Sequence, residues 1–212
     1  MDEVNKLYAT VEQAIEELKE GKAIIVVDDE DRENEGDFLA LGKFATPKMI
    51  NFMANEGKGL ICVPIEEEKA KQLSLTLMVP ENTDLYRTAF TVSIDHVSTH
   101  TGISAFERST TILNMLDPEA KASDFNKPGH IFPLIAKSGG VVERPGHTEA
   151  AVDLAKLAGA EPVGVICEIM SPDGTMARGE ELKEVAERFG LVILTIKDLV
   201  EYRKSSKVLL SR

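Results

Sequence analysis

The sequence contains no tryptophan, and aromatic residues make up only 5% of its 212 positions. The hydrophobic core must therefore be built from Ile, Leu, Val, Met and Ala side chains. No apolar run approaches the roughly 20 residues that a membrane-spanning helix needs. The first ten residues, MDEVNKLYAT, also lack the basic and apolar regions of a signal peptide. We therefore expect a cytoplasmic protein with no membrane partner.

Cysteine and basic residues are also scarce. Cys62 and Cys167 lie far apart and neither belongs to a C-x-x-C pair, so we expect reduced, buried thiols and not a disulfide or zinc site. The 24 Lys and Arg residues face 36 Asp and Glu residues, which gives a formal net charge of −12. This balance argues against nucleic-acid binding, although a local arginine could still bind a phosphate. The chain also lacks P-loop, dinucleotide-binding, zinc-protease and serine-hydrolase motifs.

Helical and strand-like segments alternate along the chain without strict β-α-β order. The predicted helices cover residues 10–20, 46–57, 66–72, 105–115, 148–158, 179–189 and 197–202. The predicted strands cover residues 22–27, 38–41, 60–63, 90–94, 131–135, 162–169 and 191–196. The alternation favours one α/β domain, residues 1–204, with helices covering a mixed sheet. We expect connectors at 28–37 and 117–129 and a flexible tail at 205–212.

The most unusual segment is DDEDRENEGD at residues 28–37, in which seven of ten residues are acidic. A charge run of this kind is commonly a solvated loop. Glu33, Glu35 and Asp37 alternate, however, so in an extended strand they would share one face. Carboxylate oxygens suit hard cations such as Mg²⁺. Composition alone leaves both a solvated loop and a metal site open.

A second candidate is RPGHT, residues 144–148, immediately before a predicted helix. Free N–H groups at a helix N-terminus, with Arg144 and the Thr148 hydroxyl, could hold a phosphate. His147 could bind a metal or transfer protons. The alternative is that Thr148 only caps the helix and His147 is a surface turn residue.

Weaker signals lie elsewhere. His130 in KPGH is either a base or an ordinary turn histidine, and the hydroxyl-rich segment 98–104 is a weak candidate for a phosphate loop. Glu168 ends an apolar strand, where a carboxylate is costly without a partner. From the residues alone we infer a hard-metal site, a phosphate site and acid–base groups, but no named reaction.

The acidic decapeptide and RPGHTEA, with TGISA, DFNKPGHIFPL, AGAEPVGVICEIM and DGTMAR, resemble the 3,4-dihydroxy-2-butanone 4-phosphate synthase family over residues 11–202. The resemblance implies a three-layer α/β sandwich and a homodimer. It implies conversion of D-ribulose 5-phosphate to L-3,4-dihydroxy-2-butanone 4-phosphate and formate for riboflavin biosynthesis, with Mg²⁺ and with Mn²⁺ as a substitute. The chain shows no second, cyclohydrolase region, so we expect a monofunctional protein.

The resemblance also implies roles for individual residues. The metal ligands would be Glu33 and His147, and the catalytic residues His130, Glu168, Glu35 and Cys62. The substrate-binding residues would be Arg32, Glu33, Asp37, Thr101, Arg144, Gly146, His147, Thr148 and Glu168. Pro145 and His100 depart from the family's usual residues. The competing functions are another metal-dependent sugar-phosphate enzyme, such as an isomerase or aldolase, and a binding module without catalysis.

Overall fold

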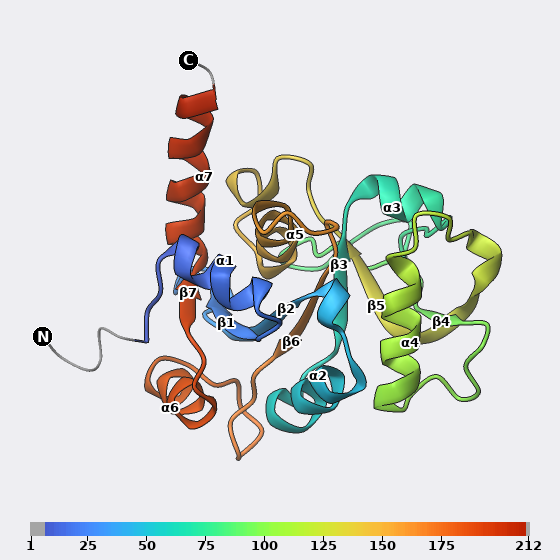
Figure 1. Cartoon of the computed structure of the whole chain (residues 1–212), viewed down its shortest axis with the longest axis horizontal. Coiled ribbons are helices and arrows are strands. Elements are labelled where there is room, and N and C mark those ends of the chain that lie inside the picture. The colour runs from blue at the N-terminus through green and yellow to red at the C-terminus, as the bar shows by residue number, and fades with distance from the viewer. Residues whose placement is uncertain (1–6, 211–212) are drawn as a thin grey trace, which may run out of the picture.

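The structure is a computed structural model that describes residues 7–210, with side chains described as far as residue 205 (Figure 1). Within these residues, seven strands form one sheet in the order β4-β5-β3-β6-β2-β1-β7. The strands are β1 (Ile24–Val27), β2 (Gly36–Leu41), β3 (Cys62–Ile65), β4 (Ile94–His96), β5 (Phe125–Ile135), β6 (Gly164–Glu168) and β7 (Ile193–Thr195). The β1–β7 and β3–β5 pairs are parallel and the other pairs are antiparallel. The sheet is therefore mixed, as predicted.

Helices cover both faces of this sheet (Figure 1). One face carries α1 (Val11–Lys19), α5 (His147–Leu157) and α7 (Ile196–Leu210), and the other carries α2 (Pro47–Phe52), α4 (Ala105–Met115) and α6 (Glu180–Phe189), while the short α3 spans Glu67–Gln72. Each face has its own hydrophobic cluster. Along β2, Phe38 and Ala40 enter one cluster and Leu39 and Leu41 the other, because alternate strand side chains point to opposite faces. The predicted α/β fold with helices on both sides of a mixed sheet is confirmed.

The helix starts follow local sequence. Thr10 caps α1 in a capping box, since its hydroxyl accepts from the Gln13 main chain and the Gln13 side chain accepts from the Thr10 main chain. Thr46 caps α2, which has Pro47 in its first turn. That helix continues into a π-helical turn, Met53–Gly57, which ends where Lys58 adopts a φ of 67°.

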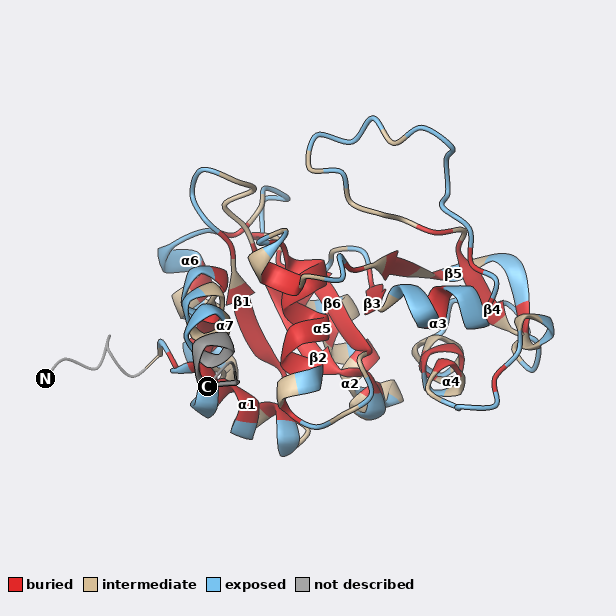
Figure 2. Cartoon of the chain, turned by 90° about the horizontal axis from the view of Figure 1, so that it is seen from above, coloured by how far each residue is buried: buried red, intermediate tan, exposed pale blue. Residues whose placement is uncertain are grey.

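The sheet register gathers several polar side chains in its centre. Asp37 in β2 pairs directly with Glu168 in β6, and Cys62 in β3 pairs with Ile166 of the same strand. The loop that joins β1 to β2 lies at the same end of the sheet (Figure 2). The fold therefore places the acidic segment beside Glu168 and Cys62.

Two strands begin earlier in the sequence than predicted, whereas the other five begin two to four residues later. β2 starts at Gly36 and not at Phe38, so Asp37 belongs to the strand. β5 starts at Phe125, inside the predicted connector 117–129. Its Pro-Gly pair is a strand breaker in sequence rules, but here a register shift in the β4–β5 pairing accommodates it at one edge of the sheet.

Two further elements differ from prediction. The predicted strand 90–94 contains isolated bridges at Phe90 and Thr91, and the regular strand β4 covers Ile94–His96. The last helix was predicted to end at residue 202, but α7 continues to Leu210, so residues 205–210 of the predicted tail are helical. No helix in residues 7–210 is long and apolar enough to span a membrane.

Candidate active site

A cavity of about 210 Å³ opens where the β1–β2 loop, the start of α5 and the polar ends of β3 and β6 meet. Residues from separate parts of the sequence line it together. Those already predicted for a site are Arg32, Glu33, Glu35, Asp37, Cys62, Arg144, His147, Thr148 and Glu168. The remaining lining residues are Asp84, Thr88, Phe90, Leu134 and Ile166.

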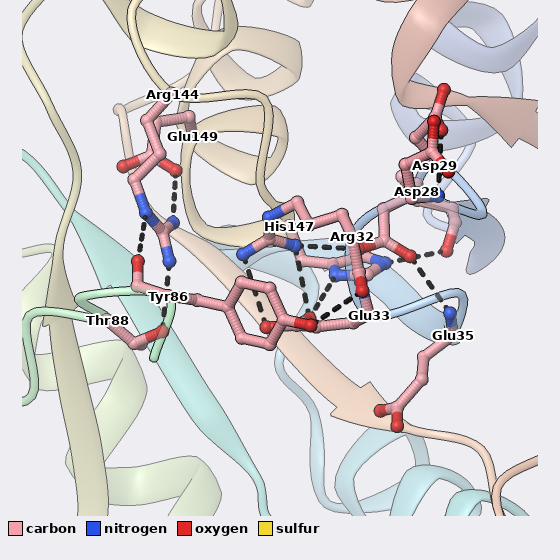
Figure 3. A network of polar contacts seen from close by, with 12 residues as sticks. Asp28, Asp29, Arg32, Glu33, Glu35, Tyr86, Thr88, Arg144, His147 and Glu149 are labelled. Carbon is pink, nitrogen blue, oxygen red and sulfur yellow. Dashed lines mark hydrogen bonds and ion pairs between the residues drawn. The ribbon is translucent and has the colours of Figure 1, made fainter. Parts of the chain in front are cut away.

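Asp28 organises the acidic loop from inside. Its side chain is fully buried, and one carboxylate oxygen accepts hydrogen bonds from Arg32 Nη1 at 2.8 Å and from the Glu33 main-chain N–H at 3.1 Å. The other oxygen accepts from the Glu35 main-chain N–H at 2.9 Å. Because both Asp28 oxygens accept these three hydrogen bonds, they hold the loop in its folded conformation (Figure 3).

The loop does not continue β2 as an extended strand. Because residues 28–35 turn around Asp28, Glu33 and Glu35 lie in the loop and only Asp37 lies in the strand. The expectation that Glu33, Glu35 and Asp37 share one strand face is therefore wrong. All three side chains nevertheless line the same cavity.

Glu33 and His147 are neighbours in the lining of the cavity, with 3.5 Å between Glu33 Oε2 and His147 Nδ1 (Figure 3). His147 Nε2 lies 3.2 Å from the main-chain oxygen of Val26. Because a carbonyl oxygen only accepts, Nε2 carries the hydrogen and Nδ1 points to Glu33. Asp28, Glu33 and His147 offer ligand atoms within 4.8 Å of one another. Asp28 is engaged in the loop, and Glu33 also pairs with Arg32, whose Nη1 lies 3.1 Å from Glu33 Oε2 and whose Nη2 donates to Oε1 at 3.2 Å. Glu33 and His147 are nevertheless the pair whose ligand atoms face each other, and a carboxylate with an imidazole can hold a divalent cation.

Burial and neighbouring charges shift the pKa values of the ionisable side chains in the cavity. Burial raises the pKa of Asp37 to about 7, against the opposing attraction of His147. Burial lowers the pKa of His147, but Asp37, Glu33 and Asp28 outweigh it and raise the value to about 9. Burial also acts to raise the pKa of Glu33, but the His147 hydrogen bond and the Arg32 charge lower it below its ordinary value. Oδ1 of Asp37 is buried and has no hydrogen-bond partner among the described residues, which is typical of an atom that serves a ligand.

Arg144 is fixed on three sides (Figure 3). Its Nη1 donates to Glu149 Oε2 at 2.6 Å, its Nε to the Tyr86 main-chain oxygen at 3.1 Å, and its Nη2 to Thr88 Oγ1 at 2.9 Å. Glu149 is buried in α5, so this ion pair is shielded from solvent. A guanidinium held in this way offers a fixed positive charge to an anion in the cavity.

The start of α5 adds uncapped donors beside Arg144. Gly146 is the N-cap and has no side-chain capping bond, so the simple alternative for Thr148, a helix cap, is wrong. His147 is buried and not a surface turn residue. The first N–H groups of α5 and the Thr148 hydroxyl are therefore available to a ligand. A Cβ on Gly146 would come within 2.5 Å of Arg144 Nη1, so this glycine permits the close approach.

No sequence signal marks Tyr86 or Thr88 as a site residue. Both lie in an irregular loop without a motif, and they enter the site because Arg144 and Arg32 reach them. The Tyr86 hydroxyl donates to the Arg32 main-chain oxygen at 2.6 Å, and the Arg32 guanidinium lies 5.0 Å from the centre of the Tyr86 ring. This loop therefore ties the acidic segment to the RPGHT segment.

Glu168 is held at the floor of the cavity. Its Oε2 accepts the Leu60 main-chain N–H at 2.7 Å, which leaves Oε1 for other partners. The neighbouring Gly59 is needed for this approach, because a Cβ there would lie 2.4 Å from Oε2 of Glu168. Burial raises the pKa of the Cys62 thiol well above its ordinary value, so Cys62 lines the cavity as a neutral thiol.

Glu35 is held from the opposite side by the DGTMAR segment. Burial and the charge of Glu33 raise the pKa of Glu35, and Arg178 Nη2 lies 3.4 Å from its Oε1. Arg178 also donates to the Glu33 main-chain oxygen at 3.4 Å. The DGTMAR segment therefore stabilises the acidic loop through Arg178.

Three predicted site residues do not line this cavity, and one of them, Gly146, still adjoins it as the N-cap of α5. Thr101 and His130 are not among its lining residues. His130 Nδ1 lies 2.7 Å from Asp95 Oδ2, and the Thr101 hydroxyl donates to Glu107 Oε2 at 3.2 Å. Their roles stay predictions, and one chain does not bring them to the other predicted site residues.

Comparison with known proteins identifies relatives over almost the whole chain. The family model for 3,4-dihydroxy-2-butanone 4-phosphate synthase matches residues 12–202. The riboflavin biosynthesis protein RibBA of Bacillus mycoides strain KBAB4 is 62% identical over 206 residues, which cover 97% of this chain and 52% of that protein. RibBA of Bacillus cereus strain G9842 is 61% identical with the same coverage. The chain thus spans about half the length of these relatives, which do not support the expected monofunctional form.

Solved structures agree with this assignment. A two-domain 3,4-dihydroxy-2-butanone 4-phosphate synthase, RibBX of A. baumannii, is 47% identical with a TM-score of 0.89, over 92% of this chain and 58% of that one. A 3,4-dihydroxy-2-butanone 4-phosphate synthase in complex with two magnesium ions is 38% identical with a TM-score of 0.91, over 94% of this chain and 99% of that one. With the family model matched across residues 12–202, the chain belongs to the 3,4-dihydroxy-2-butanone 4-phosphate synthase family.

Proposed function

We propose that the protein converts D-ribulose 5-phosphate to L-3,4-dihydroxy-2-butanone 4-phosphate and formate, as a step of riboflavin biosynthesis. The observation that carries the proposal is the single cavity that joins a Glu33–His147 pair to an anchored Arg144. Such a site suits a ketose that has vicinal oxygens at one end and a phosphate at the other. A cytoplasmic location stays a prediction from the sequence.

The phosphate would bind at the start of α5. Arg144 supplies a fixed guanidinium, Thr148 a hydroxyl and the helix its uncapped N–H groups. These donors converge on one side of the cavity and match the oxygens of a phosphate. The sugar would then extend toward the acidic loop.

The donor set at the other side fits Mg²⁺, with Mn²⁺ as a substitute. Glu33 and His147 would hold the ion, and the unpartnered oxygen of Asp37 lies in the same cavity. One or two protein ligands are usual for Mg²⁺, which keeps water and substrate oxygens in its other positions. When bound, the ion would supply Lewis-acid polarisation of the ketose oxygens.

The proton transfers would fall to His130 and to the carboxyl groups of the cavity. Asp37, whose burial raises its pKa to about 7, is suited to accept and return a proton near neutral pH. Glu168 has one oxygen fixed by Leu60 and the other free, and Glu35 lies in the same wall. Cys62, a neutral thiol, would donate a weak hydrogen bond and would not act as a nucleophile.

The overall reaction needs no external oxidant or reductant. Loss of one water, a shift of the carbon skeleton and addition of one water convert the five-carbon sugar phosphate into a four-carbon ketone phosphate and formate. The water lost and the water gained cancel. The carbon at position 4 leaves as formate.

The direct test is formate release from D-ribulose 5-phosphate labelled with ¹³C at carbon 4. We expect labelled formate and an equal amount of the four-carbon product with Mg²⁺, and neither with a chelator. An isomerase or aldolase would consume the substrate without formate. Folded protein that releases no formate in the presence of Mg²⁺ would refute the proposal.

We also propose that the protein is a homodimer in which Thr101 and His130 serve the cavity of the second protomer. The support is their place outside their own chain's cavity, together with exposed apolar side chains close to Thr101 in the sequence. Ile103 and Phe106 near Thr101 are 54% and 73% exposed. Clusters of this kind commonly mark interfaces.

Mixing two inactive variants tests this arrangement. Glu33→Gln and His130→Ala each impair the protein alone, but their heterodimer has one cavity with both native residues. Random mixing should recover about one quarter of the wild-type activity, because about half of the dimers are mixed and each has one intact site. No recovery, or a monomeric mass in light scattering, would refute the shared site.

A further inference from the structure

The carboxylate of Asp95, in β4, contacts two nitrogen atoms of His130, the main-chain nitrogen and the ring Nδ1. Oδ1 of Asp95 accepts the His130 main-chain N–H at 2.9 Å, and Oδ2 lies 2.7 Å from His130 Nδ1. The Asp95 side chain is 12% exposed and that of His130 is 44% exposed. Neither residue lines the cavity of its own chain.

The geometry determines which ring nitrogen can react. An ionised carboxylate only accepts hydrogen bonds, so Nδ1 must carry a hydrogen. In the neutral ring Nε2 is then the unprotonated nitrogen. Within the described residues no hydrogen bond involves Nε2, and the ring is half exposed. The available lone pair therefore points outward while the protonated side stays buried.

Two glycines allow this close pairing. A Cβ on Gly102, where φ is +78°, would lie 2.0 Å from Asp95 Oδ2, so the loop that carries Thr101 packs directly on the carboxylate. A Cβ on Gly129 would lie 2.0 Å from the Ile94 carbonyl carbon, so this glycine lets β5 approach β4. Asp95 is thus enclosed between the Thr101 loop and His130.

We propose that Asp95 is a positioning residue that keeps His130 in the tautomer with a free Nε2 and thereby makes His130 an effective proton acceptor. The inference rests on the proposed lyase function. In the step, the Nε2 lone pair forms a bond to a substrate proton as the bond to that proton breaks and leaves its electron pair on the substrate. The imidazolium then faces the Asp95 carboxylate, and Nε2 returns the proton later.

Asp95→Asn is the informative change because an amide has only one acceptor oxygen. The site presents two N–H groups, and the main-chain one cannot move its hydrogen. The amide oxygen should therefore stay on the main-chain N–H and the amide NH₂ should face Nδ1. Two N–H donors would then face each other. His130 can avoid this by carrying its hydrogen on Nε2, so that Nδ1 accepts from the amide and Nε2 no longer has a free lone pair.

The first measurement is the His130 tautomer in ¹⁵N-histidine-labelled protein at about pH 8, where an ordinary histidine is neutral. The chain has four histidines, and His130→Ala identifies the signal. We expect Nδ1–H in the wild type and Nε2–H in Asp95→Asn. Ser93→Ala is the matched control, because it removes the acceptor of the Gly129 main-chain N–H at 3.1 Å without touching His130.

The second measurement is formate release. Asp95→Asn should lower kcat by about 10²-fold or more with little change in KM, and Asp95→Glu, which keeps the carboxylate, should recover part of the loss. In a His130→Ala background, Asp95→Asn should change kcat by less than about twofold, because the two residues act as one unit.

The outcomes separate the two proposals. Formate release by the wild type tests the lyase function, whereas the tautomer is observed without turnover. An unchanged tautomer in Asp95→Asn would overturn the positioning role. An equal loss of kcat from Asp95→Asn in the wild-type and His130→Ala backgrounds would overturn it too, as would full activity in His130→Ala. If Asp95→Asn does not fold, Asp95→Glu must keep the Nδ1–H tautomer with a reduced kcat.

Discussion

His147 donates its Nε2–H to the main-chain oxygen of Val26, 3.2 Å away. Val26 belongs to the buried strand β1, so the sheet sets the orientation of the ring. Nδ1 is thereby directed at Glu33 before any ion is bound. A ligand pair prepared in this way needs little rearrangement to bind a cation.

Glu33→Gln should abolish formate release without unfolding the protein. The amide keeps the size of the side chain but loses the charge, so Mg²⁺ affinity should fall by at least about tenfold. Calorimetric titration with Mg²⁺ and the formate assay measure the two effects. Glu30→Gln, an exposed change in the same loop, should alter neither, and an active Glu33→Gln variant would remove Glu33 from the metal site.

Metal binding should release a proton from His147. The surrounding carboxylates outweigh burial and raise the pKa of His147 to about 9, so below that pH a cation must displace the Nδ1 proton. Apparent Mg²⁺ affinity should therefore rise with pH, by up to about tenfold per unit below the His147 pKa. Titrations in two buffers with different ionisation enthalpies report the released proton directly. Affinity that is flat between about pH 6.5 and pH 8.5 would contradict this linkage.

Local sequence predicted much of this site. The acidic run after a buried strand, and RPGHT before a helix, correctly indicated two polar segments at element ends, whereas the strand face expected from the alternation of Glu33, Glu35 and Asp37 was wrong. These signals are local, because helix starts and strand ends depend on neighbouring residues. The common cavity depends on the pairing of β2 with β6 and on the position of α5, which spacing alone does not determine.

The parts that sequence could not predict depend on contacts between distant residues. Tyr86 and Thr88 carry no motif, and Arg144 donates hydrogen bonds to them although they lie 58 and 56 positions away in the sequence. Asp95 and His130 are 35 positions apart and meet through the irregular pairing of β4 and β5. The Pro-Gly pair of β5 also falls in a segment predicted as a connector, because such residues interrupt strands, but a register shift in the pairing with the edge strand β4 accommodates it.

Asp28→Ala should destabilise the acidic loop more than any neighbouring change. It removes a buried acceptor of three hydrogen bonds and leaves Arg32 without that partner. We expect a loss of about 3 kcal/mol in the free energy of unfolding, measured by denaturant titration, and weaker Mg²⁺ binding. Asp29→Ala is the matched control, since Asp29 is exposed and, among the residues that the structure describes, its side chain accepts only from the nearby Asp31 main chain. Equal stability of the two variants would contradict the organising role of Asp28.

Gly59→Ala should displace Glu168. The added Cβ would lie 2.4 Å from Glu168 Oε2 and 2.6 Å from its main-chain oxygen, and the main chain cannot move aside as a flexible side chain could. We expect kcat to fall by about 10-fold or more, with Mg²⁺ affinity nearly unchanged because Glu33 and His147 are untouched. Wild-type kcat in a folded Gly59→Ala variant would show that the position of Glu168 is not critical.

Arg203→Ala should show that α7 is part of the folded domain. Arg203 pairs with Asp153 of α5, whose side chain is 2% exposed and also accepts the Val141 main-chain N–H at 3.0 Å. Removing the guanidinium leaves a buried carboxylate with one partner fewer, so the free energy of unfolding should fall by about 2–4 kcal/mol. Lys204→Ala, an exposed change at the next position, should leave it within about 0.5 kcal/mol of the wild type. If both variants unfold at the same denaturant concentration as the wild type, the helix beyond residue 202 does not contribute to stability, and the predicted flexible tail would begin there.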